Sequence, residues 1–412
     1  MRKLFSLFLA LVATTSLWAY DFQIDGICYK ILKGDEVEVT FQEAYSYDNY
    51  LDLVTAHIPS TIEYSGVTYR ITSINSEAFK GCRTLTSITI PEHIKSIGER
   101  AFSECTSLTS VIWNAKKCAD FKEYPFRDSQ ITSFIFGDSV EHIPAYLCCL
   151  MNNLTSITLP NSVTSIGHSV FWGCSSLSCI TIPENVTVLG SSFAHCNSLT
   201  TIQWNAKNCA DFTYSPFSEI GSRNVSITFG DSVKYIPANL CYQMDALTSI
   251  TIPTNVTSIA YNAFGNNVDT VTITADSVED FCKSRIGYSL PSYHICRLVI
   301  AEKEMTDLVI PNSIDSIHDC AFYSMPFTSV TIPENITSIG HAAFRGCRFL
   351  TSVNIPNSLK TIENSAFYDC VSLDSIVIPK SVTTIEDYAF QGCIFARENF
   401  INNSSLDAGA NN

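Results

Sequence analysis

The chain has 412 residues, a formal net charge of −15, and hydrophobic residues at 46% of the total. This apolar fraction supports a sizeable core and excludes a globally disordered chain. The negative charge argues against nucleic acid, a heparin-like polyanion or an anionic membrane surface as the main partner, because there is no basic field to attract phosphate or sulfate groups.

The N-terminal residues MRKLFSLFLALVATTSLWA have the composition of an export signal. Arg2 and Lys3 precede an apolar stretch, and Ala19 is a small residue suited to cleavage. Residues 1–19 are therefore predicted to be a signal peptide. The first cysteine, Cys28, lies well beyond the cleavage position, and no later stretch reaches about 18 consecutive apolar residues. We expect a protein that is secreted or displayed at the outer cell surface, with no lipid attachment and no transmembrane helix.

From residue 62 to residue 393 the chain repeats a unit of about 23 residues. Residues 85–107, 154–176 and 350–372 share the pattern L-x-x-I-x-I-P-x-x-V-x-x-I-x-x-x-A-F-x-x-C. A unit of this length cannot bury its own apolar face, so successive units are expected to stack into a solenoid. Copies of the unit begin at Ile62, Leu85, Leu108, Ile131, Leu154, Leu177, Leu199, Asn224, Leu247, Val268, Phe327, Leu350 and Leu373.

Each unit is expected to be mostly β-structure. Residues 87–90 alternate hydroxyl side chains with isoleucine, which is the period of a half-buried strand, and Pro91 ends that strand because it has no N–H to donate. Ile94 and Ile97 then predict a second, short extended segment that also faces inward. We expect about thirteen stacked coils with one parallel strand per coil.

The IPxxVxxIxxxAFxxC signature within this pattern resembles the leucine-rich repeats of the BspA-like type, which occur in surface and secreted proteins of host-associated bacteria and some parasitic protists. The segment DFQIDGICYKI (21–31) is also similar to the usual opening of such proteins. The resemblance implies a leucine-rich-repeat solenoid. It also implies a role in attachment to host matrix proteins and to other cells.

The chain divides into four parts on this basis. Residues 1–19 are the signal peptide, and residues 20–61 are predicted to form a β-rich cap that covers the open end of the stack. Residues 62–393 form the solenoid, with an irregular segment from 268 to 326. Residues 394–412 are polar and are predicted to be a disordered tail.

Two long segments are nearly identical, namely WNAKKCADFKEYPF (113–126) and WNAKNCADFTYSPF (204–217). They belong to a four-coil block, at about 85–176, that recurs at 177–267. A weaker third copy, ITADSVEDF (273–281), has Val278 where the first two have cysteine. Because valine cannot replace a nucleophile or a metal ligand, we interpret the segment as a variant structural coil. Its aspartates, Asp120, Asp211 and Asp280, are expected to cap the following turn.

No catalytic, metal or cofactor site is predicted. The sequence holds no GxSxG, HExxH, phosphate-loop or EF-hand motif and no zinc-ligand spacing among its 17 cysteines. Stacking places seven of these cysteines near one another, which allows a ladder of disulfides or metal ligands. The favoured interpretation is a small buried hydrophobe, since Asn267 and Met325 occupy the same position in other coils. The seven are Cys82, Cys105, Cys174, Cys196, Cys347, Cys370 and Cys393.

The outward face of the strands is the candidate ligand-contact surface, because solenoids generally bind through such faces. An alternative is that these hydroxyl residues only keep a strand soluble. The irregular segment near 268–310 ranks second as a binding site. The candidate residues on the face are Ser87, Thr89, Ser156, Thr158, Ser226, Thr228, Ser249, Thr251, Ser329 and Thr331.

These features predict a non-enzymatic adhesin that binds an extracellular host or microbial protein or glycan, and not nucleic acid. The alternative is a structural surface protein that associates with itself. A secreted hydrolase is a third, less favoured hypothesis, which would need a cluster of ionisable side chains in one cleft.

Overall fold

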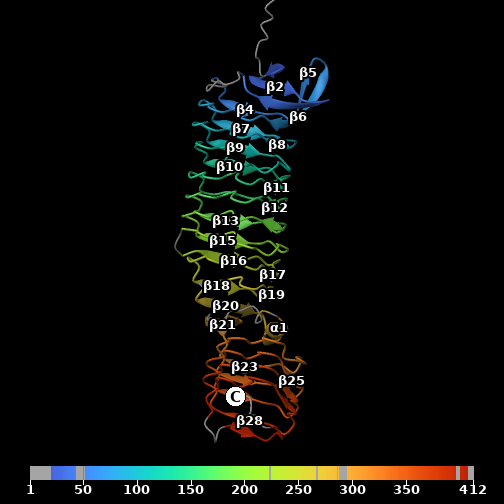
Figure 1. Ribbon diagram of the computed structural model, residues 1–412, viewed down its shortest axis with the longest axis vertical. Coiled ribbons are helices and arrows are strands. Elements are labelled where there is room, and N and C mark those ends of the chain that lie inside the picture. Colours follow the sequence, from blue (N-terminus) through green and yellow to red (C-terminus); the bar gives the residue numbers. More distant parts are fainter. Residues whose placement is uncertain are drawn as a thin grey trace, which may run out of the picture.

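The computed structural model describes residues 20–42, 50, 52–221, 224–265, 268–284, 286, 295–395 and 400–406. The predicted signal peptide lies outside these residues. The chain forms an elongated stack of about 14 turns with a spacing of ~23 residues, and its N-terminal cap lies at one end (Figure 1). The predicted leucine-rich-repeat solenoid is confirmed. In the described part of the chain no helix is long and apolar enough to cross a membrane.

One side of the stack carries the longer strand of each coil and is called here the long-strand face. Neighbouring strands pair in parallel and in register, as in Ile88↔Val111 and Ile202↔Ile227. This face consists of β4 (Thr55–His57), β7 (Ser87–Ile90), β9 (Ser110–Trp113), β10 (Ser133–Phe136), β13 (Cys179–Ile182), β15 (Thr201–Trp204), β16 (Ser226–Phe229), β18 (Ser249–Ile252), β20 (Thr270–Ala275), β21 (Ile295–Ile300), β23 (Asp307–Val309), β24 (Ser329–Thr331), β26 (Ser352–Asn354), β28 (Ile376–Ile378) and β30 (Phe400–Asn402).

The predicted second extended segment is confirmed as a set of two-residue strands, called here the short-strand face. These strands also pair in parallel, for example Ile166↔Leu189. Together the two faces enclose the core between them. The short strands are β8 (Ser96–Ile97), β11 (His142–Ile143), β12 (Ser165–Ile166), β14 (Val188–Leu189), β17 (Tyr235–Ile236), β19 (Ser258–Ile259), β25 (Ser338–Ile339), β27 (Thr361–Ile362) and β29 (Thr384–Ile385).

The core holds rows of phenylalanine rings that stack from coil to coil. Phe322, Phe344, Phe367 and Phe390 form one row, with ring centroids 5.0, 5.2 and 5.5 Å apart. Because coils stack at the spacing of parallel strands, identical side chains at one template position come into contact, and offset aromatic stacking is favourable at these distances. Each row therefore ties a coil to its neighbours.

The turn that contains the A-F-x-x-C part of the template is called here the turn edge. In most coils it has two positions with left-handed backbone, one immediately before the alanine position and one two residues after the phenylalanine. Arg100 (φ 56) and Glu104 (φ 62) occupy them in one coil, and Ala342 (φ 51) and Gly346 (φ 73) in another. Glycine adopts this conformation without strain but occupies only some of these positions, so stacking holds other residues in it.

The N-terminal cap is a small sheet built from β1 (Phe22–Ile24), β2 (Ile27–Ile31), β3 (Glu36–Thr40), β5 (Thr61–Tyr64) and β6 (Val67–Ile74). The far end of β6 pairs with β8, so the cap sheet continues directly into the short-strand face. Strand β4 lies within the predicted cap, yet it pairs in parallel with β7. The first coil of the solenoid therefore starts earlier than residue 62, and residues 61–70 form a hairpin inserted into that coil.

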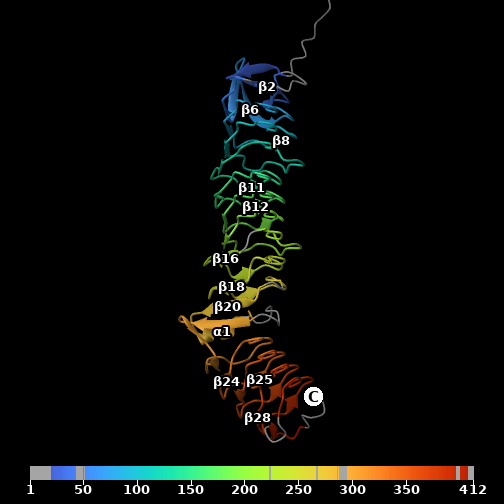
Figure 2. The same cartoon turned by 90° about the vertical axis from the view of Figure 1, so that its left-hand side faces the viewer.

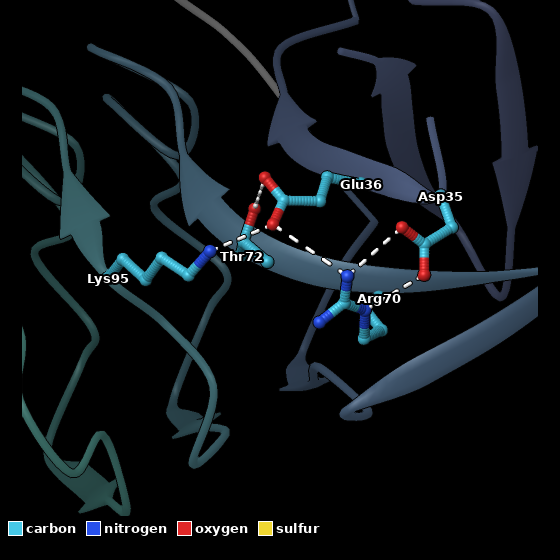
Figure 3. A network of polar contacts seen from close by, with 5 residues as sticks. All are labelled: Asp35, Glu36, Arg70, Thr72 and Lys95. Atoms are coloured by element: carbon cyan, nitrogen blue, oxygen red, sulfur yellow. Dashed lines mark hydrogen bonds and ion pairs between the residues drawn. The ribbon is translucent and has the colours of Figure 1, made fainter. Parts of the chain in front are cut away.

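Charged side chains join strands within the cap and link the cap to the first coils (Figure 3). Arg70 Nε lies 2.9 Å from Asp35 Oδ2, and Lys95 Nζ lies 2.8 Å from Glu36 Oε1. All four side chains are partly exposed, so we expect these pairs to orient the cap more than they stabilise it.

The stack changes direction in the segment predicted to be irregular. Helix α1 (Val278–Lys283) replaces a coil turn after β20, and β21 folds back on β22 (Lys303–Glu304) as an antiparallel pair. Figure 2 shows that the coils from β24 onward tilt away from the axis of the preceding coils. Ser277 caps the helix by accepting a hydrogen bond from the Asp280 N–H.

The prediction of a disordered tail from residue 394 is wrong for residues 400–406. Phe400–Asn402 form β30, which pairs in parallel with β28. Phe395, Phe400 and Leu406 pack against the core. These apolar side chains cover the last coil, which would otherwise leave Phe390 facing solvent.

Candidate binding surfaces

The predicted hydroxyl residues all lie on the outward side of the long-strand face. Ser249 and Thr251 are exposed on β18 and lie beside Thr270 and Thr272 of β20 in register. We call these four residues the central hydroxyl patch. Ser156 and Thr158 are exposed as predicted, but residues 154–159 form no strand, so this coil interrupts the parallel ladder.

The outward-facing hydroxyl groups differ in whether they form a hydrogen bond with another protein group. Within the described residues, the four hydroxyls of the central hydroxyl patch and those of Ser87, Thr89, Ser156, Thr158 and Thr331 have no side-chain hydrogen bond to the protein. Thr228 Oγ1 instead donates to Gln203 Oε1 at 2.5 Å, and Ser329 Oγ to Asp307 Oδ1 at 2.6 Å. Only the first group retains its full donor and acceptor capacity for a ligand.

A further column of hydroxyl residues at the entrance to each strand is structural. Thr109 Oγ1 donates to Thr86 O at 3.3 Å, and Thr351 Oγ1 donates to Thr328 O at 2.9 Å. Each bond joins a hydroxyl to a carbonyl one coil earlier. The sequence pattern alone did not separate these residues from the outward-facing hydroxyls.

Exposed apolar side chains interrupt the long-strand face singly, as Val309 does on β23, and as adjacent pairs at two places. Ile112 and Ile135 lie side by side in the register of β9 and β10 and are 38% and 53% exposed. Near the C-terminal end, Val377 and Ile401 are also adjacent and are 49% and 47% exposed. The second pair lines a shallow groove of about 720 Å³, the C-terminal groove, together with Asn354 and other polar side chains.

The duplicated segments are structural, as predicted. Trp113 and Trp204 are fully buried, and Cys118 and Cys209 are 1% and 4% exposed. Burial raises the pKa of both thiols to about 12, so neither is a nucleophile at neutral pH.

Two of the three aspartates act as caps, but they do so across coils. Asp120 Oδ1 accepts from the Ala145 N–H at 2.8 Å, and Asp211 Oδ1 accepts from the Ala238 N–H at 2.9 Å. Both acceptors serve the next coil, and not the turn that follows in the sequence. Asp280 differs, because it lies in α1 and its side chain accepts from Ser277 Oγ.

Asp120 is also part of a three-residue hydrogen-bonded chain that the sequence did not reveal. His142 Nε2 lies 3.0 Å from Asp120 Oδ1, and His142 Nδ1 lies 2.7 Å from Ser165 Oγ. The three residues are 22 to 45 positions apart, so only an alignment of the coils in columns would bring them together.

These residue types form catalytic triads in hydrolases, yet the surroundings here are those of a structural network. The backbone N–H groups of Ser165 and Gly167 donate to Glu141 O and Ile143 O, so they are not available to stabilise an oxyanion. In the second block Tyr235 replaces the histidine and still donates to Asp211. The network therefore serves to cap a coil.

The structure supports the interpretation that the stacked cysteines serve as small buried apolar residues. Each thiol of this column for which a bond is described donates to a backbone carbonyl of the preceding coil, as Cys105 Sγ does to Phe79 O at 3.1 Å and Cys196 Sγ to Phe171 O at 3.1 Å. The 17 cysteines are free thiols, and the described residues contain no cluster suited to a metal ion.

The two strand-bearing faces, the turn edge and the core rows define a leucine-rich-repeat solenoid that presents broad surfaces. The sequence profile of the BspA type leucine rich repeat region (6 copies) matches residues 72–192, 141–271 and 295–409. The chain belongs to this family.

Several solved structures are similar to the chain. A leucine-rich repeat protein from Bacteroides ovatus is 27% identical, with 91% of this chain and 93% of that chain covered and a TM-score of 0.44. A leucine rich cell surface protein from Faecalibacterium prausnitzii is 23% identical, with 90% and 86% covered and a TM-score of 0.32. The leucine rich repeat protein of T. pallidum is 19% identical, with 54% and 88% covered and a TM-score of 0.33. No curated protein sequence matches the chain.

Proposed function

We propose that the protein is a secreted or cell-surface adhesin that binds an extended extracellular protein or glycan through its long-strand face. The observation that carries this proposal is the central hydroxyl patch, where hydroxyl groups without a protein partner are aligned in register on two paired strands. A ligand on this surface meets hydrogen-bond donors and acceptors at regular spacing. Because these hydroxyl groups have no partner in the protein, ligand binding breaks no hydrogen bond within the protein.

The composition of the surface favours contact over catalysis. Hydroxyl residues are uncharged and alternate with buried isoleucine, so the strands hold them in place and they cost less to desolvate than charged groups. Binding of this kind needs no catalytic group, metal or cofactor.

The test uses one substitution at two places in the same coil. Thr251→Arg puts a long charged side chain in the central hydroxyl patch, whereas Thr254→Arg puts it in the adjacent exposed turn. The full mature chain is measured by surface plasmon resonance against a panel of purified extracellular-matrix proteins and on a glycan array. We expect saturable binding to at least one probe, weakened at least tenfold by Thr251→Arg and unchanged by Thr254→Arg. Absence of saturable binding, or equal loss in both variants, refutes the proposal.

A second candidate, self-association as a structural surface protein, rests on the C-terminal end. Strand β30 pairs only with β28 among the described strands, and Ile401 is exposed beside Val377. An unpaired strand edge with apolar neighbours is a site where another chain can add a strand. A monodisperse monomer in light scattering at high protein concentration excludes this candidate.

A further inference from the structure

A small pocket on the turn edge combines basic and aromatic side chains. It has a volume of about 250 Å³ and is lined by Arg100, Lys122, Glu123, Tyr124, Arg127 and Tyr146. It is separate from the long-strand face, and its residues come from three consecutive coils. None of these side chains is fully buried, although one side of Tyr146 packs against the core.

The charges of this pocket oppose the charge of the protein as a whole. Arg100 Nε pairs with Glu123 Oε2 at 2.9 Å, and Arg127 Nε lies 3.7 Å from Asp128 Oδ2. Lys122 is exposed and has no ion pair within the described part of the chain. The six lining residues thus carry three positive side chains and one negative, in a chain whose formal net charge is −15. Asp128 beside Arg127, and Glu77 and Glu99 near Arg100, offset part of this charge, whereas Lys122 keeps its charge free.

Aromatic rings form one wall of the pocket. The rings of Tyr124 and Tyr146 lie 5.6 Å apart in an edge arrangement, and His168 continues the row 4.6 Å beyond Tyr146. The two tyrosines are only partly buried. Such rings pack on the C–H faces of sugars and present hydroxyl groups for hydrogen bonding.

The duplicated block provides an internal comparison. Its core residues and its caps are retained, but all six positions of the pocket differ. The corresponding residues in the second block are Ser191, Thr213, Tyr214, Ser215, Ser218 and Asn239, none of which is charged. The coil therefore folds without basic side chains at these positions and without tyrosine at the positions of Tyr124 and Tyr146, so the fold does not explain why the first block has them.

We propose that this pocket is a second binding site, and that it takes a carboxylate-bearing saccharide such as a uronic or sialic acid unit. Lys122 and Arg127 bind the carboxylate, since guanidinium and ammonium groups make charge-assisted hydrogen bonds to it. Tyr146 packs against the sugar ring. A single carboxylate matches the one basic side chain that has no ion pair, Lys122, whereas a sulfated polyanion with many charges is repelled by the acidic surface around the pocket. This site does not depend on the proposed role of the long-strand face.

The test takes its substitutions from the second block, where the same scaffold already accommodates them. Binding of the full chain is measured by surface plasmon resonance to an immobilised oligosaccharide ending in glucuronic acid and to its carboxyl-reduced, neutral counterpart. We expect at least tenfold tighter binding of the acid, with the preference lost in Lys122→Thr/Arg127→Ser. The matched control Lys234→Thr/Lys360→Thr removes two exposed positive charges elsewhere and is expected to keep the preference.

A further variant, Tyr146→Asn, separates stacking from charge. Asparagine occupies this position in the second block as Asn239, with the same left-handed backbone. We expect it to weaken binding of the glucuronic acid probe at least fivefold and to leave binding of polyglutamate unchanged. Equal binding of the acidic and neutral probes, or no effect of Lys122→Thr/Arg127→Ser, overturns the proposal. Tighter binding of polyglutamate or of a sulfated polysaccharide than of the sugar acid also overturns it.

Discussion

Replacing Phe344 by alanine tests whether stacked rings hold the C-terminal coils together. Phe344 is fully buried, and its ring lies 5.0 Å from that of Phe322 and 5.2 Å from that of Phe367. Truncating a buried phenylalanine costs about 3–5 kcal/mol, which includes the loss of two ring pairs of roughly 0.5–1.5 kcal/mol each. Because a solenoid is stabilised by contacts between neighbouring coils, the loss weakens both interfaces of this coil.

Phe349→Ala is the matched control, since Phe349 lies in the same coil and is 61% exposed. We expect a change below about 0.5 kcal/mol for this variant. The assay is guanidinium unfolding followed by circular dichroism, with the free energy of unfolding taken by linear extrapolation to zero denaturant. A loss below about 1.5 kcal/mol for Phe344→Ala, or equal losses in the two variants, would refute the reasoning.

The remaining predictions concern the backbone and the thiols. Gly346 has φ 73, and a Cβ there would lie 2.8 Å from Ser324 Oγ, so Gly346→Ala is expected to lower the free energy of unfolding by roughly 1–2 kcal/mol. Glu104 has φ 62 at the equivalent position, so Glu104→Gly is expected to raise the free energy of unfolding by up to about 1 kcal/mol. If chemical unfolding shows changes of the same sign for the two variants, the prediction is contradicted. Burial raises the pKa of the Cys196 thiol to about 12, above its ordinary value of 9.0, so the folded state keeps a proton that the unfolded state loses. Stability should therefore be full below about pH 9 and fall by up to about 1.4 kcal/mol per pH unit for each such thiol between pH 9 and 12. Chemical unfolding at pH 8 and pH 10.5 checks it, and Cys196→Ala should reduce the difference.

The repeat pattern alone determined the architecture of this protein. A 23-residue template with a Ser-Ile-Thr-Ile strand, a proline and an Ala-Phe pair has only one way to bury its apolar residues, which is to stack. The inward side of each strand, the second extended segment and the burial of Cys118 followed from alternation and from comparison of the copies. The same comparison identified the duplicated segment as a coil and not a site.

The tertiary structure decided everything that depends on contacts between coils. Asp120, His142 and Ser165 meet only because stacking converts a separation of one coil into a few ångströms. The left-handed positions of the turn edge are hidden in the sequence, since only some of them are glycine.

Contacts between coils also decided the properties of the long-strand face and of the C-terminal end of the stack. The same residue types, serine and threonine, occur in the central hydroxyl patch and at the strand entrances. Only contacts with the neighbouring coil show which of their hydroxyl groups are hydrogen-bonded to the protein. Strand β30 forms in a polar segment because the last coil needs a cover for its core. A local pattern fixes which way a side chain points within its own coil, whereas the next coil determines what that side chain touches.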